Sequence, residues 1–337
     1  MESDGKASSY RESGVDIDAG TEVVRRIKGL ARGTYTSGVL SGVGSFGGLF
    51  AIDPSISDPV LVASADGVGT KLKVAFAAGI HHTIGIDLVN HCVNDILVQG
   101  ARPLFFLDYL ATGRLAPDVA EQIVGGMADA CRENGCALLG GETAEMPGFY
   151  RDGEYDVAGF IVGVVSRARI IDGHGIVRGD ALVALPSSGL HTNGYSLARQ
   201  IAFDRLKLGV DSHVDALADT VGAVFLRSHR SYLKAIAPLL DRGWIKGMAH
   251  ITGGGITDNL PRTLPEGRSF SIDRESWVVP PVFAWLAKVG KIDDVEMFRT
   301  FNMGVGLILV CAESDVAQLI GSLRDLGESP WLLGHVS

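Results

Sequence analysis

Short runs of glycine at the ends of apolar segments constrain the fold of this chain more than any other feature. The 337 residues include 44 glycines, which cluster between apolar segments rather than in a single linker. Glycine in such runs usually lets the backbone turn with positive φ or approach a ligand closely. The sequence therefore predicts compact elements joined by tight loops, some of which could bind a ligand.

Between the glycine runs, apolar β-branched segments alternate with amphipathic segments of helical period. In the first half of the chain, this pattern predicts helices at 19–30, 85–99 and 117–134 and strands at 60–65, 104–109, 137–139 and 157–165. In the second half, it predicts helices at 195–205, 223–242 and 314–326 and strands at 181–185, 269–273, 304–310 and 331–333. Such alternation is typical of mixed α/β proteins.

The polar, glycine-containing stretch 167–179 is the best place for a domain boundary. A chain of 337 residues exceeds the length at which one hydrophobic core usually stops growing. We therefore expect two α/β domains, an N-terminal one at 1–168 and a C-terminal one at 169–337.

Composition and charge exclude several classes of function. The formal net charge of −9 argues against non-specific nucleic-acid binding, which needs a basic surface to displace counterions. The longest apolar runs are far shorter than a membrane span, and residues 1–10 lack the apolar core of a secretory signal. We expect a cytoplasmic protein that binds neither nucleic acid nor membrane.

The cysteines indicate buried free thiols rather than a disulfide framework or a zinc cluster. Their spacing is too irregular for either arrangement. The four are Cys92, Cys131, Cys136 and Cys311.

One glycine loop resembles a dinucleotide-binding fingerprint but lacks its context. Residues 42–47 match G-x-G-x-x-G, and Asp66 lies at about the distance expected of a ribose-binding acid. Pro54 follows Gly47 too closely for the required helix to begin there. We interpret the loop, with Gly44 and Gly47, as a cover for phosphate, although a plain turn would also explain it. The chain lacks a P-loop match, so any ATP site must use another scaffold.

The segment after the first predicted strand combines a carboxylate, two glycines, a hydroxyl and an ammonium. Asp66 can bind a metal ion, while the backbone at Gly67 and Gly69 is exposed for phosphate oxygens. Thr70 and Lys71 add a hydroxyl and a cation for the same oxygens. A hairpin turn closed by an Asx contact is the alternative interpretation.

The predicted helix at 85–99 carries short polar side chains where a solvated helix would carry Lys, Glu or Arg. These polar residues share one face of the helix and are Asp87, Asn90, His91, Asn94 and Asp95. Short acids held rigidly suit magnesium, and Asp95 is the strongest ligand candidate. A polar contact between domains is the alternative.

A third acidic site follows the predicted strand at 137–139. Gly140 and Gly141 precede Glu142, so two glycines again bring backbone close to a carboxylate at a strand end. This arrangement suits an anion held with a metal ion, and we add Glu142 to the predicted metal ligands. A wide surface turn ended by Pro147 would explain the same residues.

Two loops of the second half each lead into a helical segment. Residues 186–196 contain hydroxyls, an amide and a histidine, and residues 250–259 contain three successive glycines. A helix N-terminus with Ser, Thr or Asn can bind an anion without a net positive charge. Helix capping explains either loop alone, but the two together favour an anion site.

Six ordered motifs resemble the signature set of the phosphoribosylformylglycinamidine cyclo-ligase family. The resemblance covers the chain from about residue 9 to its end, at the spacing of the family. The motifs are GVDIDAG at 14–20, DGVGTK at 66–71, CVND at 92–95, GGETAEMPG at 140–148, HTNGYS at 191–196 and TGGG at 252–255. The family is similar to selenophosphate synthetase, thiamine-monophosphate kinase, formylglycinamide ribonucleotide amidotransferase and a hydrogenase maturation protein, which share an ATP-binding fold without a P-loop.

The resemblance implies a homodimer in which strands of both N-terminal domains pair into a central barrel, with the C-terminal domains closing the cleft. It also implies that ATP and formylglycinamidine ribonucleotide give aminoimidazole ribonucleotide, ADP and phosphate, with Mg²⁺ as a cofactor. The departures are Ala65 and Thr192, where relatives carry Thr and Ser, and neither removes a charge.

The resemblance further implies roles for individual residues. Mg²⁺ on the triphosphate would be held by Asp66, Asp95 and Glu142. His191 would polarise the formyl oxygen or move a proton, and with Lys71 and Asp95 it forms the predicted catalytic set. The predicted nucleotide contacts are Gly44, Gly47, Asp66, Gly67, Gly69, Thr70, Lys71, Asn94 and Gly141. The predicted contacts to the substrate, including its ribose 5′-phosphate, are Ser187, Ser188, Gly189, His191, Asn193 and Gly254.

Three other functions remain open at this point. A selenophosphate synthetase would be expected to carry Cys or selenocysteine in the glycine loop at 42–48, which has neither. A hydrogenase maturation protein would be expected to end in a reactive Cys, whereas this chain ends in His335, Val336 and Ser337. A silent ATP-binding scaffold would have lost one of the acids, and all are present.

Overall fold

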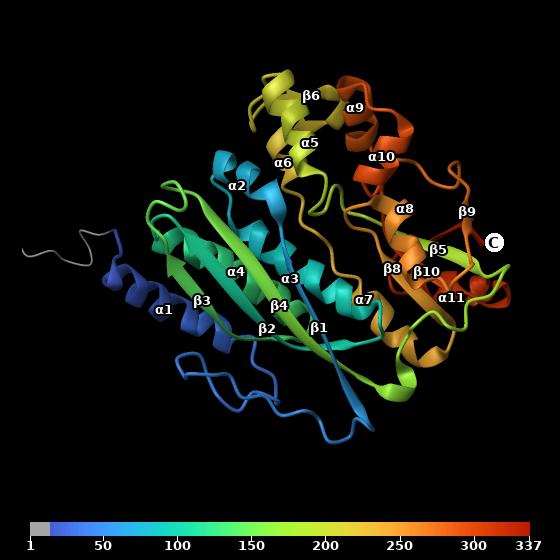
Figure 1. Ribbon diagram of the computed structural model, residues 1–337, viewed down its shortest axis with the longest axis horizontal. Coiled ribbons are helices and arrows are strands. Elements are labelled where there is room, and N and C mark those ends of the chain that lie inside the picture. The colour runs from blue at the N-terminus through green and yellow to red at the C-terminus, as the bar shows by residue number, and fades with distance from the viewer. Residues whose placement is uncertain (1–13) are drawn as a thin grey trace, which may run out of the picture.

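The computed structural model describes residues 14–337, so the expectation for residues 1–10 lies outside the described chain. Figure 1 shows the N-terminal half, up to residue 168, on the left and the C-terminal half on the right. The first half contains α1 (Ile17–Arg32), β1 (Pro59–Gly67), α2 (Leu72–Ala78), α3 (His82–Leu97), β2 (Arg102–Thr112), α4 (Pro117–Glu133), β3 (Ala137–Glu145) and β4 (Tyr155–Ser166). The second half contains β5 (Ala181–Pro186), α5 (Tyr195–Arg199), β6 (His213–Val214), β7 (Asp219–Thr220), α6 (Val221–Phe225), α7 (Leu233–Ile236), β8 (Ile245–His250), α8 (Gly255–Asn259), β9 (Phe270–Ile272), α9 (Pro281–Gly290), α10 (Asp294–Thr300), β10 (Val305–Cys311), α11 (Val316–Asp325) and β11 (Trp331–Val336).

The N-terminal sheet has the strand order β1-β4-β2-β3. β4 is antiparallel to both β1 and β2, whereas β2 and β3 are parallel and therefore need a crossover, which α4 supplies. α3 and α4 cover one face of the sheet. The two helices pack backbone to backbone, because a Cβ on Gly85 or Gly126 would lie 2.0 or 1.9 Å from a carbonyl oxygen of the other helix.

The opposite face of this sheet is apolar, and Figure 1 shows no described helix lying over it. Gly159 and Gly163 of β4 face α3, so Phe160 between them points away from the helices. Phe160 is 44% exposed, and Leu61 on the same face of β1 is 56% exposed. The β1–β4 part of this face therefore presents large exposed apolar side chains, whereas Phe50 of the loop before β1 packs on Phe105 of β2.

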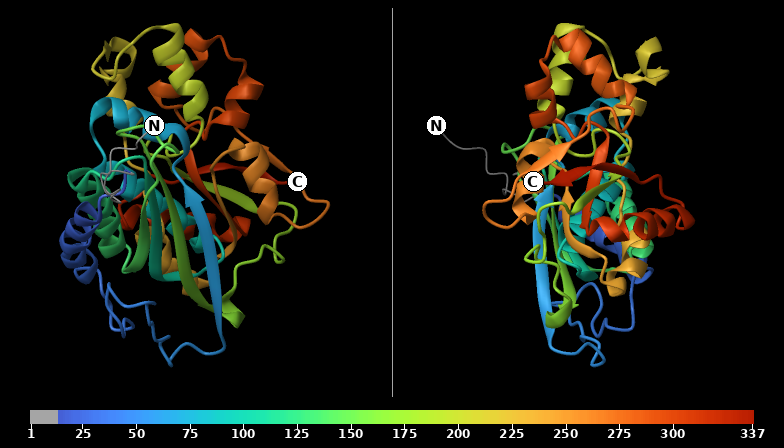
Figure 2. Two further views of the ribbon diagram at one scale, coloured as in Figure 1. Left: turned by 60° about the vertical axis from the view of Figure 1, so that its left-hand side comes forward. Right: turned by 90° about the vertical axis from the view of Figure 1, so that its right-hand side faces the viewer.

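The C-terminal sheet is antiparallel throughout and has the order β8-β10-β5-β11-β9. β10 is buried along its whole length, as is nearly all of the central strand β5. Figure 2 shows helices on either side of these strands, which explains why their sequences are continuously apolar rather than alternating. β8, at the edge of the sheet, ends at His250.

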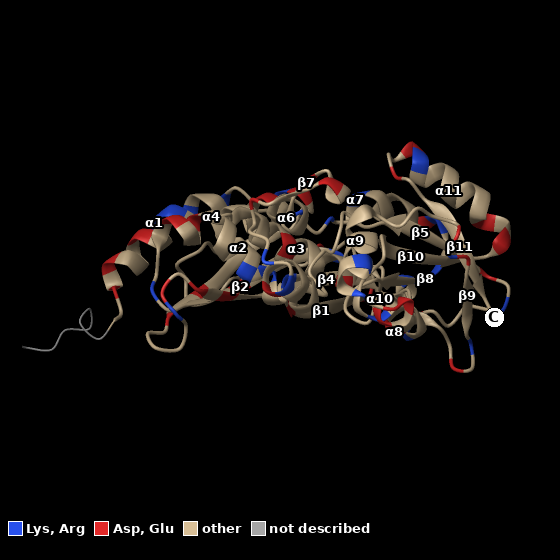
Figure 3. Cartoon of the chain, turned by 90° about the horizontal axis from the view of Figure 1, so that it is seen from above, with Lys and Arg blue, Asp and Glu red and all other residues tan. Residues whose placement is uncertain are grey.

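The outer surface mixes charges of both signs. Figure 3 shows residues of both signs on α1, where the acidic residues lie in the first half of the helix and the basic residues in the second. On α1, for example, Glu22 forms ion pairs with Arg25 and Arg26. None of the described helices combines the length and the apolar character that spanning a membrane requires.

The mixed α/β class predicted from the sequence is confirmed, but two of the expected elements are wrong in extent. The helix expected at 223–242 is broken: α6 ends at Phe225, and the chain continues without helix or strand to Tyr232, just before α7. We call residues 226–232 the junction segment. The strand expected at 137–139 continues to Glu145, so the glycines expected in a loop lie within β3.

Candidate active site

A chain of hydrogen bonds joins the two halves beside α3. It begins at Asp66, whose Oδ2 is 2.8 Å from His91 Nε2. The other ring nitrogen of His91, Nδ1, is 2.7 Å from Thr192 Oγ1 in the C-terminal half. Thr192 Oγ1 in turn lies 3.3 Å from Nδ1 of His229, which belongs to the junction segment.

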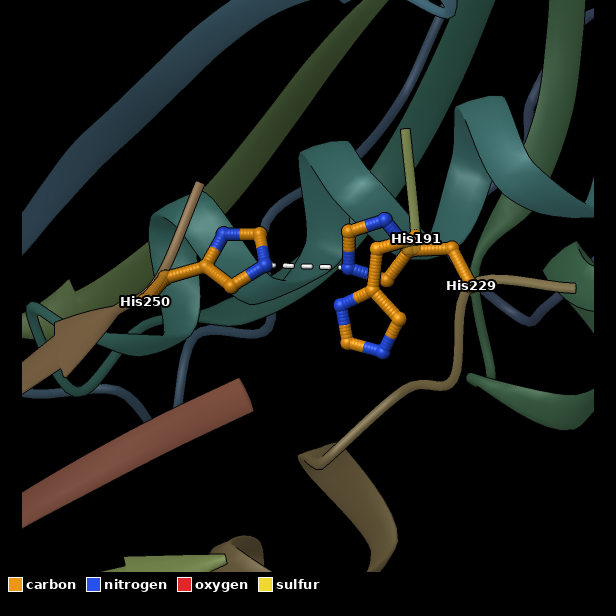
Figure 4. Close-up of side chains that lie close together, drawn as sticks. All are labelled: His191, His229 and His250. Carbon is orange, nitrogen blue, oxygen red and sulfur yellow. Dashed lines mark hydrogen bonds between the residues drawn. The ribbon is translucent and has the colours of Figure 1, made fainter. Parts of the chain in front are cut away.

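The chain continues through a second pair of histidines. His229 Nε2 is 3.0 Å from His250 Nε2, the contact drawn as a dashed line in Figure 4. His250 Nδ1 is 2.8 Å from Asp95 Oδ1, and Ser64 donates a hydrogen bond to the other oxygen of Asp95 at 3.2 Å. The chain therefore links two predicted metal ligands. We call its members the junction cluster: Asp66, His91, Asp95, Thr192, His229 and His250.

Both carboxylates of the junction cluster are stabilised in their charged form. Burial alone would raise the pKa of Asp66, but the hydrogen bond and charge of His91 bring that pKa below its ordinary value. Burial also opposes ionisation of Asp95, but the hydrogen bond and charge of His250, the charge of His91 and the hydrogen bond from Ser64 together lower the Asp95 pKa. The cluster thus contains two anionic carboxylates between imidazole rings, as a cation site requires.

The rest of the polar face of α3 binds the junction segment. Asn94 donates from Nδ2 to the carbonyl of Arg230 at 2.9 Å and accepts from the Tyr232 N–H at 3.0 Å. Asn90 donates to the carbonyl of His229 at 2.8 Å. Asn94 is fully buried, and the nucleotide contact predicted for it stays a prediction. Its amide serves the contact between domains that the sequence had left as the alternative.

Lys71 also takes part in the contact between the two halves of the chain. Its Nζ forms an ion pair with Asp87 at 2.7 Å and donates to the carbonyls of His191 and Arg227 at 3.0 and 2.8 Å. Both side chains of the pair are fully buried. Burial raises the pKa of Asp87 to about 6 despite the nearby ammonium. The phosphate contact predicted for Lys71 is therefore not available in this arrangement, because three protein oxygens surround its ammonium.

His191 lies under the junction cluster and is enclosed by protein. It is 1% exposed, and its ring stacks on His229 with 3.9 Å between centroids and 19° between planes, as Figure 4 shows. The N–H of Ser188 donates to His191 Nε2 at 3.1 Å, which places the ring proton on Nδ1. Nδ1 has no hydrogen-bond partner among residues 14–337, and burial holds the pKa of His191 well below its ordinary value. The ring is thus a neutral donor with an unused N–H.

The two predicted anion loops of the second half touch one another. A Cβ on Gly253 would lie 3.1 Å from Asn193 Oδ1, so these loops pack closely. Gly254 has φ +92° and begins α8, while Gly189 has φ +141°. These backbone conformations favour glycine.

The serines of the first loop are already engaged in protein contacts. Ser187 donates to the side-chain oxygen of Asn302 at 2.9 Å, and Ser188 donates to the carbonyl of Ser228 at 2.6 Å. Thr70 reaches across from the other half, with its Oγ1 3.1 Å from Ser196 Oγ at an exposed position. Gly69, with φ +55°, lets the backbone between Asp66 and Thr70 turn toward this junction.

A separate cavity of about 650 Å³ lies at the β3 edge of the N-terminal sheet, and we call it the edge cavity. Its walls are α1, the glycine loop and the end of β3, and among its lining residues are Gly44, Asp108, Gly141 and Glu142. Gly47 does not line it. A Cβ on Gly141 would lie 2.2 Å from Asp108 Oδ1, so this glycine makes room for the carboxyl. Burial raises the pKa of Asp108 to about 7.

Glu142 does not join Asp66 and Asp95 within one chain, contrary to the predicted three-carboxylate metal site. Across the sheet, Asp66 pairs with Gly159, Gly159 with Asp108, and Asp108 with Gly141. Glu142, the residue after Gly141, therefore lies three strand spacings from Asp66, or about 14 Å. Glu142 also follows Gly141 directly and so points to the opposite face. Asp66 and Asp95 come together; Glu142 belongs to the edge cavity.

Sequence reasoning missed four residues of these two regions. His229 was placed in a helix, and His250, Thr192 and Asp108 were given no role. One signal was available: four of the nine histidines in the chain, at 91, 191, 229 and 250, meet at this junction. Their spacing along the chain is irregular, so only the fold reveals the cluster.

Two family models match nearly all of the described chain. The model of the AIR synthase related protein N-terminal domain matches residues 50–165, and that of the C-terminal domain matches residues 177–337. A phosphoribosylformylglycinamidine cyclo-ligase of Trichlorobacter lovleyi is 53% identical over 98% of this chain and 95% of its own length. One of Myxococcus xanthus is 56% identical over 98% and 96%.

This chain belongs to the phosphoribosylformylglycinamidine cyclo-ligase family. The family predicted from the six motifs is thereby confirmed. Solved structures of other proteins share the fold at low identity. Thiamine-monophosphate kinase of Stenotrophomonas maltophilia superimposes with a TM-score of 0.70 at 17% identity, covering 94% of this chain and 93% of its own. The E. coli hydrogenase maturation protein HypE gives 0.65 at 18%, covering 94% and 90%.

Proposed function

We propose that this protein closes the imidazole ring of formylglycinamidine ribonucleotide at the expense of ATP, giving aminoimidazole ribonucleotide, ADP and phosphate in purine biosynthesis. The full-length similarity to cyclo-ligases supports this activity. The geometric observation that carries it is the meeting of Asp66 and Asp95, both ionised, at the junction of the two halves. The same similarity supports a cytoplasmic enzyme.

The proposed chemistry replaces one difficult step with two easier ones. An amide oxygen is a poor leaving group, so the γ-phosphoryl group of ATP is first transferred to the formyl oxygen. The amidine nitrogen then attacks the formyl carbon, the carbon–oxygen bond breaks, and the oxygen leaves in inorganic phosphate. The nitrogen loses a proton as the ring closes. Holding both reactants in one site makes the attack effectively unimolecular.

The donor set at the junction fits Mg²⁺. Carboxylate oxygens are the protein ligands that this ion prefers, and Asp66 and Asp95 approach the same imidazole nitrogen at 2.8 and 3.7 Å. Mg²⁺ bound there would neutralise charge on the triphosphate. Asp66, Asp95, Thr70 and the backbone after Asp66 would orient the nucleotide, while the edge cavity offers a volume in the usual range of small-molecule sites.

His191 would donate its unused Nδ1–H to the formyl oxygen, which develops negative charge during phosphoryl transfer. Because the side chain is 1% exposed, substrate can reach it only if the two halves separate. We therefore propose that the described arrangement is a closed one and that substrate binds after the loops at 186–196 and 250–259 move apart from α3.

We also propose that the working unit is a homodimer. The apolar face of the N-terminal sheet, with Phe160 and Leu61 exposed, suits a second copy of the same sheet laid against it. Small-angle scattering should give the mass of a dimer at working concentrations. A monomer mass with full activity would overturn this part of the proposal.

An assay of ADP release, with and without formylglycinamidine ribonucleotide, tests the activity directly. Substrate carrying ¹⁸O at the formyl group then tests the order of events. We expect one ¹⁸O in each phosphate released, because ring closure expels the formyl oxygen as phosphate. If the label appears in water and the phosphate stays light, ATP hydrolysis does not activate that oxygen.

A further inference from the structure

The junction cluster offers imidazole nitrogens as well as carboxylate oxygens to a cation. His91, Asp95 and His250 each contribute one ligand atom, and these atoms lie within 4.8 Å of one another. His91 Nε2 is 3.7 Å from Asp95 Oδ2, and His250 Nδ1 is 2.8 Å from Asp95 Oδ1. Ligands of a tetrahedral ion with bonds of about 2.0–2.1 Å are about 3.3 Å apart. Small side-chain movements would therefore suffice for coordination.

A second group of three histidines in the same place is less suitable. His191, His229 and His250 also bring nitrogens within 4.8 Å. However, the rings of His191 and His229 are stacked with only 19° between their planes, as Figure 4 shows. The lone pairs of stacked rings lie in parallel planes and cannot converge on one ion. The set with Asp95 is the one that can close around a metal.

The hydrogen bonds of the junction cluster leave a place for one positive charge. Five successive contacts run from Asp66 through His91, Thr192, His229 and His250 to Asp95. Each contact needs one proton. Three neutral imidazoles and one hydroxyl supply only four when both carboxylates are ionised. The cluster therefore requires one further cation, which can be an extra proton or a metal ion.

A metal ion gives every imidazole nitrogen of the cluster a partner without an extra proton. If His91 Nε2 and His250 Nδ1 coordinate the ion, each ring carries its proton on the other nitrogen, His91 Nδ1 or His250 Nε2. His91 then donates to Thr192, His250 donates to His229, and His229 donates to Thr192 from its other nitrogen. Metal-bound histidines usually have such a partner for their second N–H. Both partners are already in place.

We propose that His91, Asp95 and His250 bind a divalent first-row transition ion such as Zn²⁺, with Asp66 beside the remaining coordination position. Nitrogen ligands distinguish this site from a Mg²⁺ site, because Mg²⁺ prefers oxygen and water. His91 and Asp95 lie on α3, whereas His250 ends β8, so the ion would connect the two halves of the chain. The ion would share Asp95, and the position beside Asp66, with the proposed Mg²⁺ site, so its binding is measured separately from the ligase activity.

The test uses the full-length protein, stripped of metal, without nucleotide and in excess Mg²⁺. Zn²⁺ is titrated in competition with a chromophoric chelator. We expect one tightly bound ion per chain and a rise in the thermal unfolding temperature. His91→Gln and His250→Gln should each weaken Zn²⁺ binding at least tenfold. The matched control is His335→Gln, which removes a histidine that pairs with Glu313 at an exposed position and should bind as the wild type does.

Equal Zn²⁺ affinity in all four proteins would place the ion elsewhere and overturn the proposal. Circular dichroism of the metal-free variants checks that each one folds. If a variant does not fold, Co²⁺ replaces Zn²⁺ in the wild type. Four-coordinate Co²⁺ with nitrogen ligands absorbs strongly in the visible range and supports the site. A weak spectrum typical of six oxygen ligands contradicts it.

Discussion

The junction cluster and the edge cavity lie at the same level of one sheet, yet they are built in different ways. In the junction cluster, every polar group is bound by protein, and the partners come from both halves of the chain. In the edge cavity, glycines leave open space beside Asp108 and Glu142, and all lining residues come from the N-terminal half. Two acidic motifs that both contain glycine therefore lie in a pre-organised site and in an open one.

The largest effect should come from removing one carboxylate of the junction cluster. Asp95→Asn keeps the shape of the side chain but removes its charge. We expect ATP turnover to fall about a thousandfold, or about 4 kcal/mol in the activation barrier. ADP release and circular dichroism measure activity and fold. Unchanged turnover at limiting Mg²⁺ would remove Asp95 from the metal site.

The next test asks whether the two regions form one site across a dimer. Asp95→Asn and Glu142→Gln are each expected to be inactive alone. If Glu142 acts with the carboxylates of a second subunit, subunit exchange at equal amounts should restore about a quarter of wild-type activity. Half of the dimers are then mixed, and each mixed dimer has one intact site of two.

The control for this exchange mixes Asp95→Asn with Asp66→Asn. Both residues belong to the same junction cluster, so every cluster in a mixed dimer keeps one defect and activity should stay at background. Recovery in the control would mean that the cluster itself is shared between subunits. No recovery in the first mixture would confine Glu142 to the cavity of its own chain.

Lys71 tests whether a buried charge serves structure or phosphate binding. Lys71→Met leaves Asp87 buried without its partner, so the free energy of unfolding should fall by about 3 kcal/mol. Urea unfolding measures this loss. The double variant Lys71→Met/Asp87→Leu should recover most of it, because no unpaired charge remains. A rise in the KM for ATP with unchanged stability would instead favour the phosphate contact.

The smallest effect concerns Asp108 in the edge cavity and depends on pH. Its folded pKa of about 7 exceeds the unfolded value of about 4, so the folded protein holds the proton more tightly. Stability is therefore greatest below pH 4 and declines as the pH rises to 7. Asp108→Asn should remove this decline and gain about 1–2 kcal/mol at pH 8, since partial exposure reduces the penalty. An equal gain at pH 4 and pH 8 would exclude ionisation as the cause.

The sequence predicted local structure better than it predicted the site. The helix at 117–134 and the strand at 181–185 were found almost to the residue, because their apolar period decides them. Asp66 and Asp95 were expected near each other, and both carboxylates do approach His91 Nε2. Each lies on an element with an apolar side, and these elements pack together. The partners that Asn94 and Lys71 bind in the junction segment could not be predicted, because a buried contact to a distant backbone leaves no local pattern. Glu142 was grouped with Asp66 because strand order is invisible in the sequence.

The junction segment depends on the N-terminal half for its shape, and this sets the order of folding during synthesis. Its backbone groups bind side chains of α3, and Asn90 precedes its partner His229 by 139 residues. Because synthesis proceeds from the N-terminus and domains tend to fold as they emerge, α3 is in place before the segment leaves the ribosome. The segment then acquires its shape from a surface already formed. A fragment beginning at residue 169 should fold with residues 226–232 unordered, and adding the N-terminal half in trans should order them.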